Sequence, residues 1–389
     1  MNNQKNWTEN LRPSDPLHRD RPDREALNVP GVRASFSLVE FTPENASENL
    51  WMAYFTVSDA VFREVNPRGR LPNREAVRRL FSKPNPLYTV KRLMVLDPEE
   101  RAVAAASIAY DTELSPDYEG SSHVCQIQIS VVPACRRMKI ATCLVKHMIG
   151  KAGAMGKDTV RADAENPPGR GFCKYLKGEL IHQEVQHRSY LADVDWQLVE
   201  QWCEKGRARF PHTTIESFQE CPESDIEQFC GFFTEIINQR PVGEIETELI
   251  TTPESRRIEE RNCKRRGTEW HTMISREPGG RISAMTDITY NAREPHRIHQ
   301  YFTGVSGRDR GKGLAKRIKA EMLVYIRHKF PDAEHITTTT AKENKPMQAI
   351  NKQLGFMPRK TSYMFRWDLQ ELARRVDKVL SASSLKTKR

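Results

Sequence analysis

The sequence predicts an α/β protein of the mixed α+β sheet class, built as two similar domains in tandem. Each domain is expected to be a mixed, mostly antiparallel sheet flanked by helices. Three observations predict this class. The 389 residues suffice for two domains, or at most three. Apolar patterns typical of strands and helices return in one order in both halves. The hydrophobic fraction of 38% is enough for ordinary cores.

The first half is predicted to contain, in this order, a strand, a helix, a hairpin, a strand, a helix and a strand. The hairpin is predicted from two apolar runs on either side of the polar turn Pro98-Glu99-Glu100. The predicted elements are a strand over 33–42, a helix over 45–62, strands over 88–97, 101–111 and 124–132, a helix over 137–154 and a strand over 158–164.

The second half repeats this order. Ile226, Phe229 and Phe233 have helical spacing; Thr252 is a typical N-cap and Gly355 a typical C-terminal cap. The predicted elements are a connecting helix over 195–206, a strand over 213–219, helices over 224–239 and 251–265, strands over 269–277, 280–290 and 296–305, a helix from 314, a strand over 335–341, a helix over 344–354 and a strand over 361–369. The return of the order favours duplication over a single large α/β sheet.

The domain limits follow from these patterns and from composition. Residues 1–33 are polar and rich in Arg, Asp and Pro, which predicts a disordered N-terminal tail. We expect the first domain over 34–205, the second over 206–380 and a C-terminal tail over 381–389.

The charge distribution, the apolar runs and the cysteine spacing indicate which partners, location and metals to expect. The net charge is +10, but Lys and Arg are spread along the chain, which makes a nucleic-acid partner unlikely and suits a phosphate-bearing ligand better. No run of about 20 apolar residues and no signal-type segment occurs, so a cytoplasmic protein without a membrane partner is expected. The eight cysteines form no CxxC pair and no zinc spacing, which predicts reduced core thiols and no metal.

The stretch GVSGRDRGKGLAKRIKAEML, residues 304–323, carries the strongest chemical signal. A strand ends in a basic, glycine-containing turn that leads straight into an amphipathic helix. The first turn of a helix has unpaired N–H groups and partial positive charge, so an anion is its natural ligand. Glycines let the backbone approach that anion. The turn therefore predicts a phosphate or diphosphate site, although neither a P-loop nor a GxGxxG motif is present.

Two motifs together give a resemblance. The pattern V-x-x-x-x-R-G-K-G-L-A from Val305 to Ala315 resembles the acyl-CoA signature of the GNAT superfamily of N-acyltransferases. About thirty residues on, N-x-x-x-x-x-x-N-x-x-L-G-F from Asn344 to Phe356 resembles the companion motif. The resemblance is strong over 267–367, fair over 212–266 and rests mostly on element order over 34–180. The layout is similar to the tandem-domain branch that includes the mycothiol synthases.

The resemblance implies acetyl-CoA as co-substrate and assigns residues to it. Backbone N–H groups of the turn would bind the CoA diphosphate, the edge of the preceding strand would pair with the pantetheine arm, and an asparagine of the companion motif would contact CoA. These residues are, in turn, Arg310, Gly311, Lys312, Gly313, Leu314 and Ala315; Thr303, Gly304 and Val305; and Asn344.

Two residues are candidates for catalysis. Asn351 stands where many GNAT members carry a tyrosine that protonates the leaving thiolate. Asn cannot do so, but it can hydrogen-bond the thiol, and Tyr363 is a possible substitute. Asp287 matches a carboxylate that takes the proton of the acceptor amine in relatives with this layout. The alternatives for Asp287 are an exposed strand position or a structural partner for an arginine.

The acceptor is expected at the first two helices of the second half and the loop between them. This loop concentrates Glu244, Glu246, Glu248 and Glu254 in a basic chain. A cationic amine attracted to Glu246 and Glu248 is one interpretation, and a solvated loop is the other.

The first half carries an altered copy of the turn, in which Arg136 and Ala141 fit the pattern but Lys139 replaces the key glycine. Ser107 stands at the position of Asp287, and Tyr175 lies near the place of the companion motif. This predicts a degenerate GNAT-like domain that retains a weak CoA site or shapes the acceptor pocket.

Three function classes remain at this stage. The first is N-acetylation of a small-molecule amine, such as an amino-sugar or an antibiotic. The second is acetylation of a protein lysine or N-terminal amine. The third is a non-catalytic acyl-CoA sensor, which the missing tyrosine keeps open. The sequence leaves the oligomeric state open.

Overall fold

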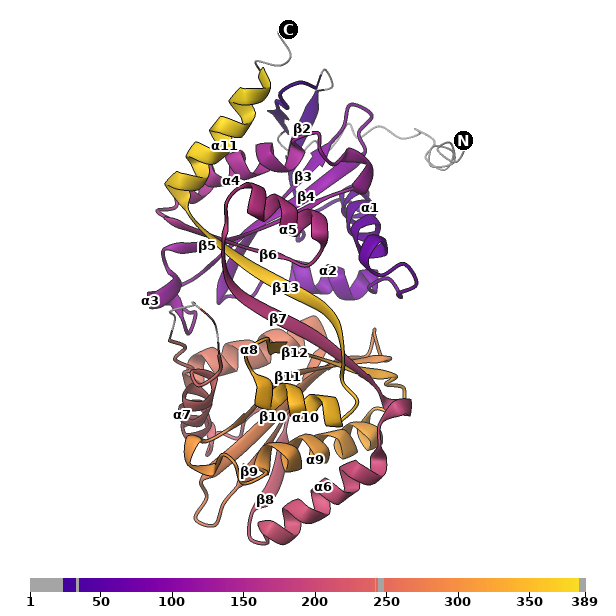
Figure 1. The fold of residues 1–389 in the computed structure, drawn as a ribbon, viewed down its shortest axis with the longest axis vertical. Coiled ribbons are helices and arrows are strands. Elements are labelled where there is room, and N and C mark those ends of the chain that lie inside the picture. The colour runs from indigo at the N-terminus through magenta and orange to yellow at the C-terminus, as the bar shows by residue number, and fades with distance from the viewer. Residues whose placement is uncertain (1–23, 33–34, 242, 244–247, 385–389) are drawn as a thin grey trace.

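The structure is a computed structural model that describes residues 24–32, 35–241, 243 and 248–384 (Figure 1). Within these residues the strands form one sheet in the order β1-β2-β3-β4-β5-β6-β13-β7-β12-β11-β10-β9-β8. The strands are β1 Arg24–Leu27, β2 Phe36–Glu40, β3 Tyr88–Leu96, β4 Ala102–Asp111, β5 Val124–Val131, β6 Thr159–Ala164, β7 Glu179–Tyr190, β8 Thr214–Phe218, β9 Thr268–Arg276, β10 Ile282–Asn291, β11 Arg297–Val305, β12 His335–Ala341 and β13 Met357–Asp368.

Helices cover the sheet in two groups, which define a first unit around β1–β6 and a second unit around β8–β12. The helices are α1 Glu48–Val65, α2 Arg74–Ser82, α3 Tyr118–Ser121, α4 Ile140–Ala154, α5 Pro167–Tyr175, α6 Trp196–Arg209, α7 Ile226–Ile237, α8 Pro253–Arg266, α9 Leu314–Lys329, α10 Lys345–Gln353 and α11 Leu369–Ser384. Short 3-10 turns at Pro133–Cys135 and Gly307–Asp309 precede α4 and α9.

Two strands exchange between the units and join their sheets. β7 follows the first unit in the chain but pairs antiparallel with β12 of the second. β13 follows the second unit but pairs antiparallel with β6 of the first. β7 and β13 also pair with each other, and Figure 1 shows them crossing side by side between the units. The predicted element order thus occurs twice, and the exchange makes one sheet from the two copies.

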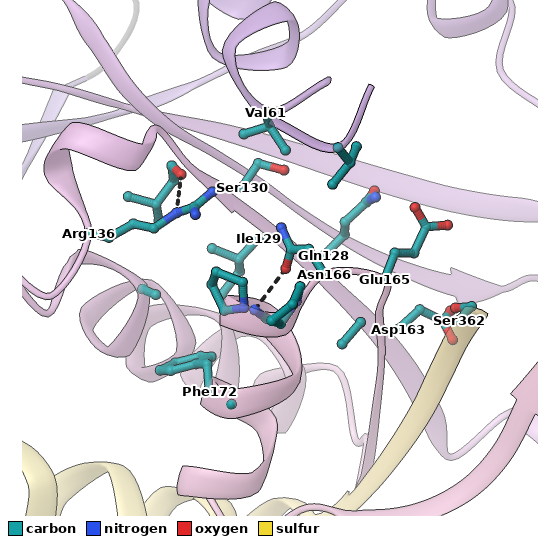
Figure 2. A pocket seen from close by; sticks show the side chains of 18 of the residues that line it. Val61, Gln128, Ile129, Ser130, Arg136, Asp163, Glu165, Asn166, Phe172 and Ser362 are labelled. Carbon is teal, nitrogen blue, oxygen red and sulfur yellow. Dashed lines mark hydrogen bonds between the residues drawn. The ribbon is translucent and has the colours of Figure 1, made fainter. Parts of the chain in front are cut away.

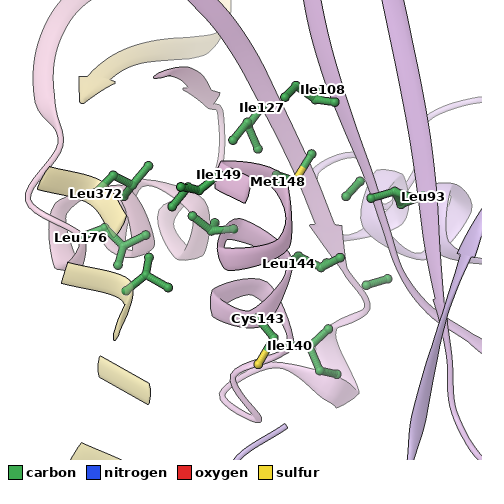
Figure 3. Packing of buried hydrophobic residues seen from close by; sticks show 14 of the residues in the cluster. Leu93, Ile108, Ile127, Ile140, Cys143, Leu144, Met148, Ile149, Leu176 and Leu372 are labelled. Atoms are coloured by element: carbon green, nitrogen blue, oxygen red, sulfur yellow. The ribbon is translucent and has the colours of Figure 1, made fainter. Parts of the chain in front are cut away.

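The hydrophobic cores follow this exchange. In the first unit, α4 packs Ile140, Leu144 and Met148 against the sheet, and Leu372 of α11 joins the same cluster (Figure 3). In the second unit, Val199 and Trp202 of α6 pack with the α9 stripe. That stripe is the predicted one, since its four apolar members are all buried; they are Leu314, Ile318, Met322 and Ile326. A boundary at residue 205 therefore describes chain order and does not separate the two cores.

Several local expectations need correction. Residues 24–27, assigned to the tail, form β1, because they pair with β2 and Arg24 bonds Glu100. Residues 381–384, also assigned to a tail, continue α11. The sequence patterns missed α2, β7 and α11. α2 and α11 are amphipathic, with Asn73 as the N-cap of α2 and Asp368 accepting the Glu371 N–H in α11, so a search for capped helices would have found them.

The cysteines are free, as predicted, and six of the eight are buried. Burial raises the pKa of the Cys173 and Cys203 thiols to about 12, which makes them inert at neutral pH.

Candidate active site

The turn before α9 has the backbone that an anion site needs. Gly311 and Gly313 adopt φ of 73° and 93°, a left-handed conformation that favours glycine. A Cβ at either position would meet no atom within 4 Å, so both glycines border open space. Arg317 N–H donates to Gly313 O at 3.1 Å. The N–H groups of Leu314 and Ala315 therefore precede the helical ladder and have no acceptor within it.

The strand before the turn diverges from its neighbour. β11 pairs with β12 in parallel only from Arg297 to Gln300, opposite His335 to Thr338. Beyond Gln300, β11 continues to Val305 in pairing with β10 alone. The strand edge that the resemblance assigns to pantetheine is thus the edge on the side of β12, which β12 no longer pairs past Gln300.

The three predicted pantetheine residues also have packing roles. The Thr303 hydroxyl lies 2.8 Å from the Thr286 hydroxyl, and Val305 is buried. Gly304 lies under α7, where a Cβ would approach Ile236 Cδ1 to 2.7 Å. Its glycine is therefore explained by close helix packing as well as by a ligand.

The basic side chains of the turn are held by the protein. Arg310 donates Nε to Val305 O at 3.4 Å and also bonds Gln239. Lys312 Nζ lies 3.0 Å from Asp309. Burial opposes ionisation of Asp309, but hydrogen bonds from Arg281 and Lys312 outweigh it and lower its pKa. The backbone of the turn, more than these side chains, is available to an anion.

The two asparagines of the companion motif do different things. Asn344 is the N-cap of α10, and its Oδ1 accepts from Met347 N at 3.2 Å. Asn351 is fully buried and donates Nδ2 to Thr340 Oγ1 at 3.2 Å. Its Oδ1 is buried with no partner among the described residues, so a thiol or amide donor could bond it without displacing a protein group.

Asp287 is buried at an irregularity of the sheet. Its Oδ1 accepts from Phe302 N at 2.7 Å and its Oδ2 from Trp270 Nε1 at 2.9 Å. The β10–β11 register shifts between Thr286 and Ile288, so Asp287 holds a β-bulge in β11 next to Thr303. Burial raises the pKa of Asp287 to about 6, opposed by the Trp270 bond and the charge of Arg256. An exposed strand position is therefore wrong for Asp287, and proton transfer stays a prediction.

The remaining predicted residues do not gather at this site. Glu244 and Glu246 lie outside the described residues, and Glu248 is exposed. Tyr363 lies on β13 opposite Ala164, in the first unit, which speaks against it as the substitute acid in the second.

A cavity of about 1060 Å³ lies at the matching turn of the first unit. Figure 2 shows Ser130 of β5, Asp163 of β6 and Asn166 and Phe172 of α5 around it. Arg137 and Lys139 adopt φ of 65° and 66°. These values match the region of Gly311 and Gly313, so the left-handed turn is kept without glycine.

Sequence reasoning missed three features of this cavity. Asn166 caps α5 as Asn344 caps α10, which the Asn-Pro pair could have indicated. Lys139 lines the cavity, and its Nζ is buried without a hydrogen-bond partner among the described residues. Asp163 reaches the same space from β6, and no local pattern shows that.

Comparison with known proteins identifies the architecture. No family model matches the sequence, and no curated protein is significantly similar to it. Among solved structures, a tandem GNAT protein from the clavulanic acid biosynthesis pathway aligns with a TM-score of 0.68 at 18% identity, covering 86% of this chain and 98% of that one. The fold is the tandem GNAT fold.

Other tandem GNAT-like structures agree with this. A GCN5-related N-acetyltransferase from Sphaerobacter thermophilus aligns with a TM-score of 0.59 at 15% identity, over 86% of this chain and 96% of that one. The N-myristoyltransferase of Saccharomyces cerevisiae, solved with myristoyl-CoA, gives 0.51 at 12% identity, over 93% and 84%. The predicted tandem GNAT fold is thereby confirmed, with β11, the turn and α9 in the order that the motif predicted.

Two further searches concern the described residues only. None of their helices combines the length and apolar character of a bilayer crossing. No three of their His, Cys, Asp or Glu side chains are grouped as metal ligands would be.

Proposed function

We propose that this protein transfers an acetyl group from acetyl-CoA to the primary amine of a small molecule by direct attack. The observation that carries the proposal is the entrance of α9, where left-handed Gly311 and Gly313 border open space ahead of unpaired helical N–H groups. Such an entrance suits a diphosphate. The diverging edge of β11 beside it suits an extended pantetheine arm.

The chemistry needs few groups. The neutral amine attacks the thioester carbonyl, a C–N bond forms, and the C–S bond breaks to release the CoA thiolate. A thiolate with a pKa of about 8.5 needs no strong acid to leave, so the absence of a tyrosine at position 351 does not prevent the transfer. The ammonium proton passes to a carboxylate, for which Asp287 is the proposed acceptor in the second unit.

The pH dependence of kcat, compared between the wild type and Asp287→Asn, shows whether Asp287 accepts the proton or only positions the backbone. As the acceptor, it must be ionised, so kcat should fall as the pH drops below about 6. Asp287→Asn should then lower kcat at every pH and lose that acid limb. If the variant keeps the limb, Asp287 only positions the bulge at Phe302.

The acceptor class rests on the neighbours and on charge. One neighbour is from a biosynthesis pathway and another, aligned with a TM-score of 0.58 at 9% identity, is a glucosamine N-acetyltransferase region. Both favour a small amine over a protein acceptor. We also propose Glu246 and Glu248 as the part of the chain that attracts the amine; Glu246→Gln with Glu248→Gln should raise its KM.

The diphosphate site is tested by a charge at the turn. Gly313→Glu should weaken acetyl-CoA binding at least 100-fold in calorimetric titration, since the carboxylate repels the diphosphate. Gly279→Glu is the matched control, because Gly279 has φ of 88° and open space around it but lies in the β9–β10 hairpin. If Gly313→Glu binds acetyl-CoA within threefold of wild type, the proposal that the diphosphate binds at this turn is wrong.

The first-unit cavity is a second candidate for the CoA site. The unpaired Lys139 ammonium favours an anion there, because a buried charge without a partner is unfavourable. Lys139→Glu keeps a left-handed side chain but reverses its charge. If this variant loses binding and Gly313→Glu does not, CoA binds in the first unit.

A further inference from the structure

Two cavities meet inside the first unit. The first is the cavity at the altered turn, which we call the turn cavity. The second, of about 550 Å³, lies between α1 and β3–β5, and we call it the helix cavity. They share a wall of seven residues: Val61, Val65, Gln128, Ser130, Asp163, Glu165 and Lys360.

The cavities meet because two strands separate. β5 pairs with β6 only from Val124 to Gln126, opposite Thr159 to Arg161. Past this point β5 continues to Val131 and β6 to Ala164, so a gap opens between them. Asp163 lies on β6 at this gap and lines both cavities.

A hydrogen bond fixes the Asp163 side chain, and its surroundings raise its pKa. Gln126 Nε2 donates to its Oδ2 at 2.6 Å. Its side chain is exposed, and both cavities that it lines are partly open to solvent. Desolvation raises its pKa, and the charges of Glu184 and Glu165 raise it further, while His182 acts the other way. A carboxylate with a raised pKa is a better proton acceptor than an ordinary one.

Basic and acidic side chains lie at different places along the joined cavities. The turn cavity is basic at the helix entrance, with Arg137 and Lys139. Carboxylates gather at the junction, where Lys360 pairs with Glu165 at 2.7 Å. This order matches a bound anion at one end and a cationic amine at the junction.

The far end of the helix cavity has a different chemistry. Tyr54, Phe62 and Phe81 line it with aromatic surface. The Arg92 guanidinium also lines it and lies 4.0 Å from the Phe81 ring centre. Burial lowers the pKa of Arg92, so an anion beside it would be stabilising.

We propose that the first unit holds an acyl-transfer site of its own, in which Asp163 takes the proton of a primary amine bound in the helix cavity while acyl-CoA occupies the turn cavity. The amine nitrogen forms a bond to the thioester carbonyl carbon, the C–S bond breaks, CoA leaves as thiolate and the ammonium proton passes to Asp163. This inference rests on the proposed acyl transfer from CoA and adds a second site and a substrate class to it.

The substrate class follows from the distance along the helix cavity. Arg92, Ser107 and Gln128 face one another on three successive strands. Strands lie about 4.8 Å apart, so Arg92 is about 10 Å from Gln128, next to the junction. The acceptor is therefore an elongated primary amine with an aromatic body and an anionic group at its far end.

The test uses the full chain, acetyl-CoA and two probes, 4-(2-aminoethyl)benzoate and 2-phenylethylamine, with release of free CoA thiol as readout. We expect turnover of the benzoate by the wild type, a loss of at least 100-fold in Lys139→Glu, and turnover within threefold of wild type in the control Gly279→Glu. Asp163→Asn should lower kcat at least 100-fold without changing acetyl-CoA affinity, and the acid limb of the wild-type pH profile should disappear. The groups that face Asp163 and shape this limb are Glu165, Glu184, His182 and Lys360.

Arg92→Met tests the anionic end. It should raise the benzoate KM at least tenfold and leave the phenylethylamine KM unchanged; an equal effect on both would overturn the substrate class. Asp163→Asn turnover within threefold of wild type would overturn the first-unit site. If Gly313→Glu loses all turnover and Lys139→Glu turns over normally, the first-unit site is wrong but the proposed function stands. Absence of turnover with any amine would reject both.

Discussion

At the scale of single residues, the two turns have the same backbone conformation but different residue types. Gly311 and Gly313 are left-handed, and so are Arg137 and Lys139, although a side chain there costs about 1 kcal/mol. The surrounding strand and helix therefore impose the shape. The residue type decides which side chain stands at the turn. Gly311 and Gly313 leave open space there, whereas Lys139 places a buried Nζ that has no partner among the described residues.

Asp287 gives a residue-scale prediction about stability. Its pKa is about 6 in the folded protein and 3.8 in the unfolded chain. The folded state thus binds the proton more tightly, and protonation stabilises it as the pH falls from about 6 to about 4. Above pH 6 the buried charge is a constant penalty. Asp287→Asn lacks this titration, so its unfolding free energy relative to wild type should be higher at pH 7.5 than at pH 4, by ~3 kcal/mol.

Denaturant unfolding of both proteins at the two pH values measures this difference. Hydrogen bonds lost by the Asn variant add an offset that does not depend on pH. Parallel stability curves across this range would contradict the burial of a titrating carboxylate at Asp287.

At the scale of elements, one glycine sets how closely α7 lies on β11. A Cβ at Gly304 would come within 2.7 Å of Ile236 Cδ1 and 2.8 Å of Phe302 Cε1. Since packed interiors tolerate extra atoms poorly, Gly304→Ala must shift α7 or the strand edge assigned to pantetheine. The packing of α7 and the shape of the predicted ligand edge are thus coupled.

Gly304→Ala should therefore lower the unfolding free energy by about 2 kcal/mol. Adding Ile236→Val removes Cδ1 and should restore part of this loss. Gly231→Ala, on α7 with no atom within 4 Å of its Cβ position, is the control and should be neutral or stabilising. Chemical denaturation of the three variants decides; a loss in Gly231→Ala equal to that in Gly304→Ala would show that the close contact with Ile236 is not the cause.

At the scale of the whole molecule, strand β13 ties the first unit to the C-terminal end of the sequence. Trp367 of β13 is buried in the first unit, where its Nε1 donates to Leu176 O at 3.0 Å. Phe356, only eleven positions earlier, is buried in the second unit. The first unit therefore cannot complete its core from a contiguous stretch of chain, whereas the core of the second unit lies between Leu191 and Phe356.

This arrangement predicts where two neighbouring truncations act. Trp367→Ala and Phe356→Ala should each cost about 3–5 kcal/mol. In hydrogen exchange, Trp367→Ala should lower the protection of α4 and β6 by two orders of magnitude or more and that of β9 and β10 less than tenfold. Phe356→Ala should show the reverse, and an equal loss in both units for both variants would refute two separable cores.

The sequence by itself determined the local elements and the motif. Apolar spacing located the α9 stripe, glycines marked the turn at 310–315, and two motifs in order indicated the GNAT fold. These signals are local, since each arises from residues within one helix, strand or turn. The same reasoning could not see that Asp287 is fully buried, because burial depends on what packs against it.

Tertiary structure alone decided the rest. The exchange of β7 and β13, the bond between Asp287 and Trp270 and the cavity that Asp163 and Gln128 both line each join residues from different strands. Strand pairing is not local, because a strand's two edges can bond any partner of fitting register. The sequence therefore determined which segments form strands and helices, and only the folded chain decided which of them share a core and a cavity.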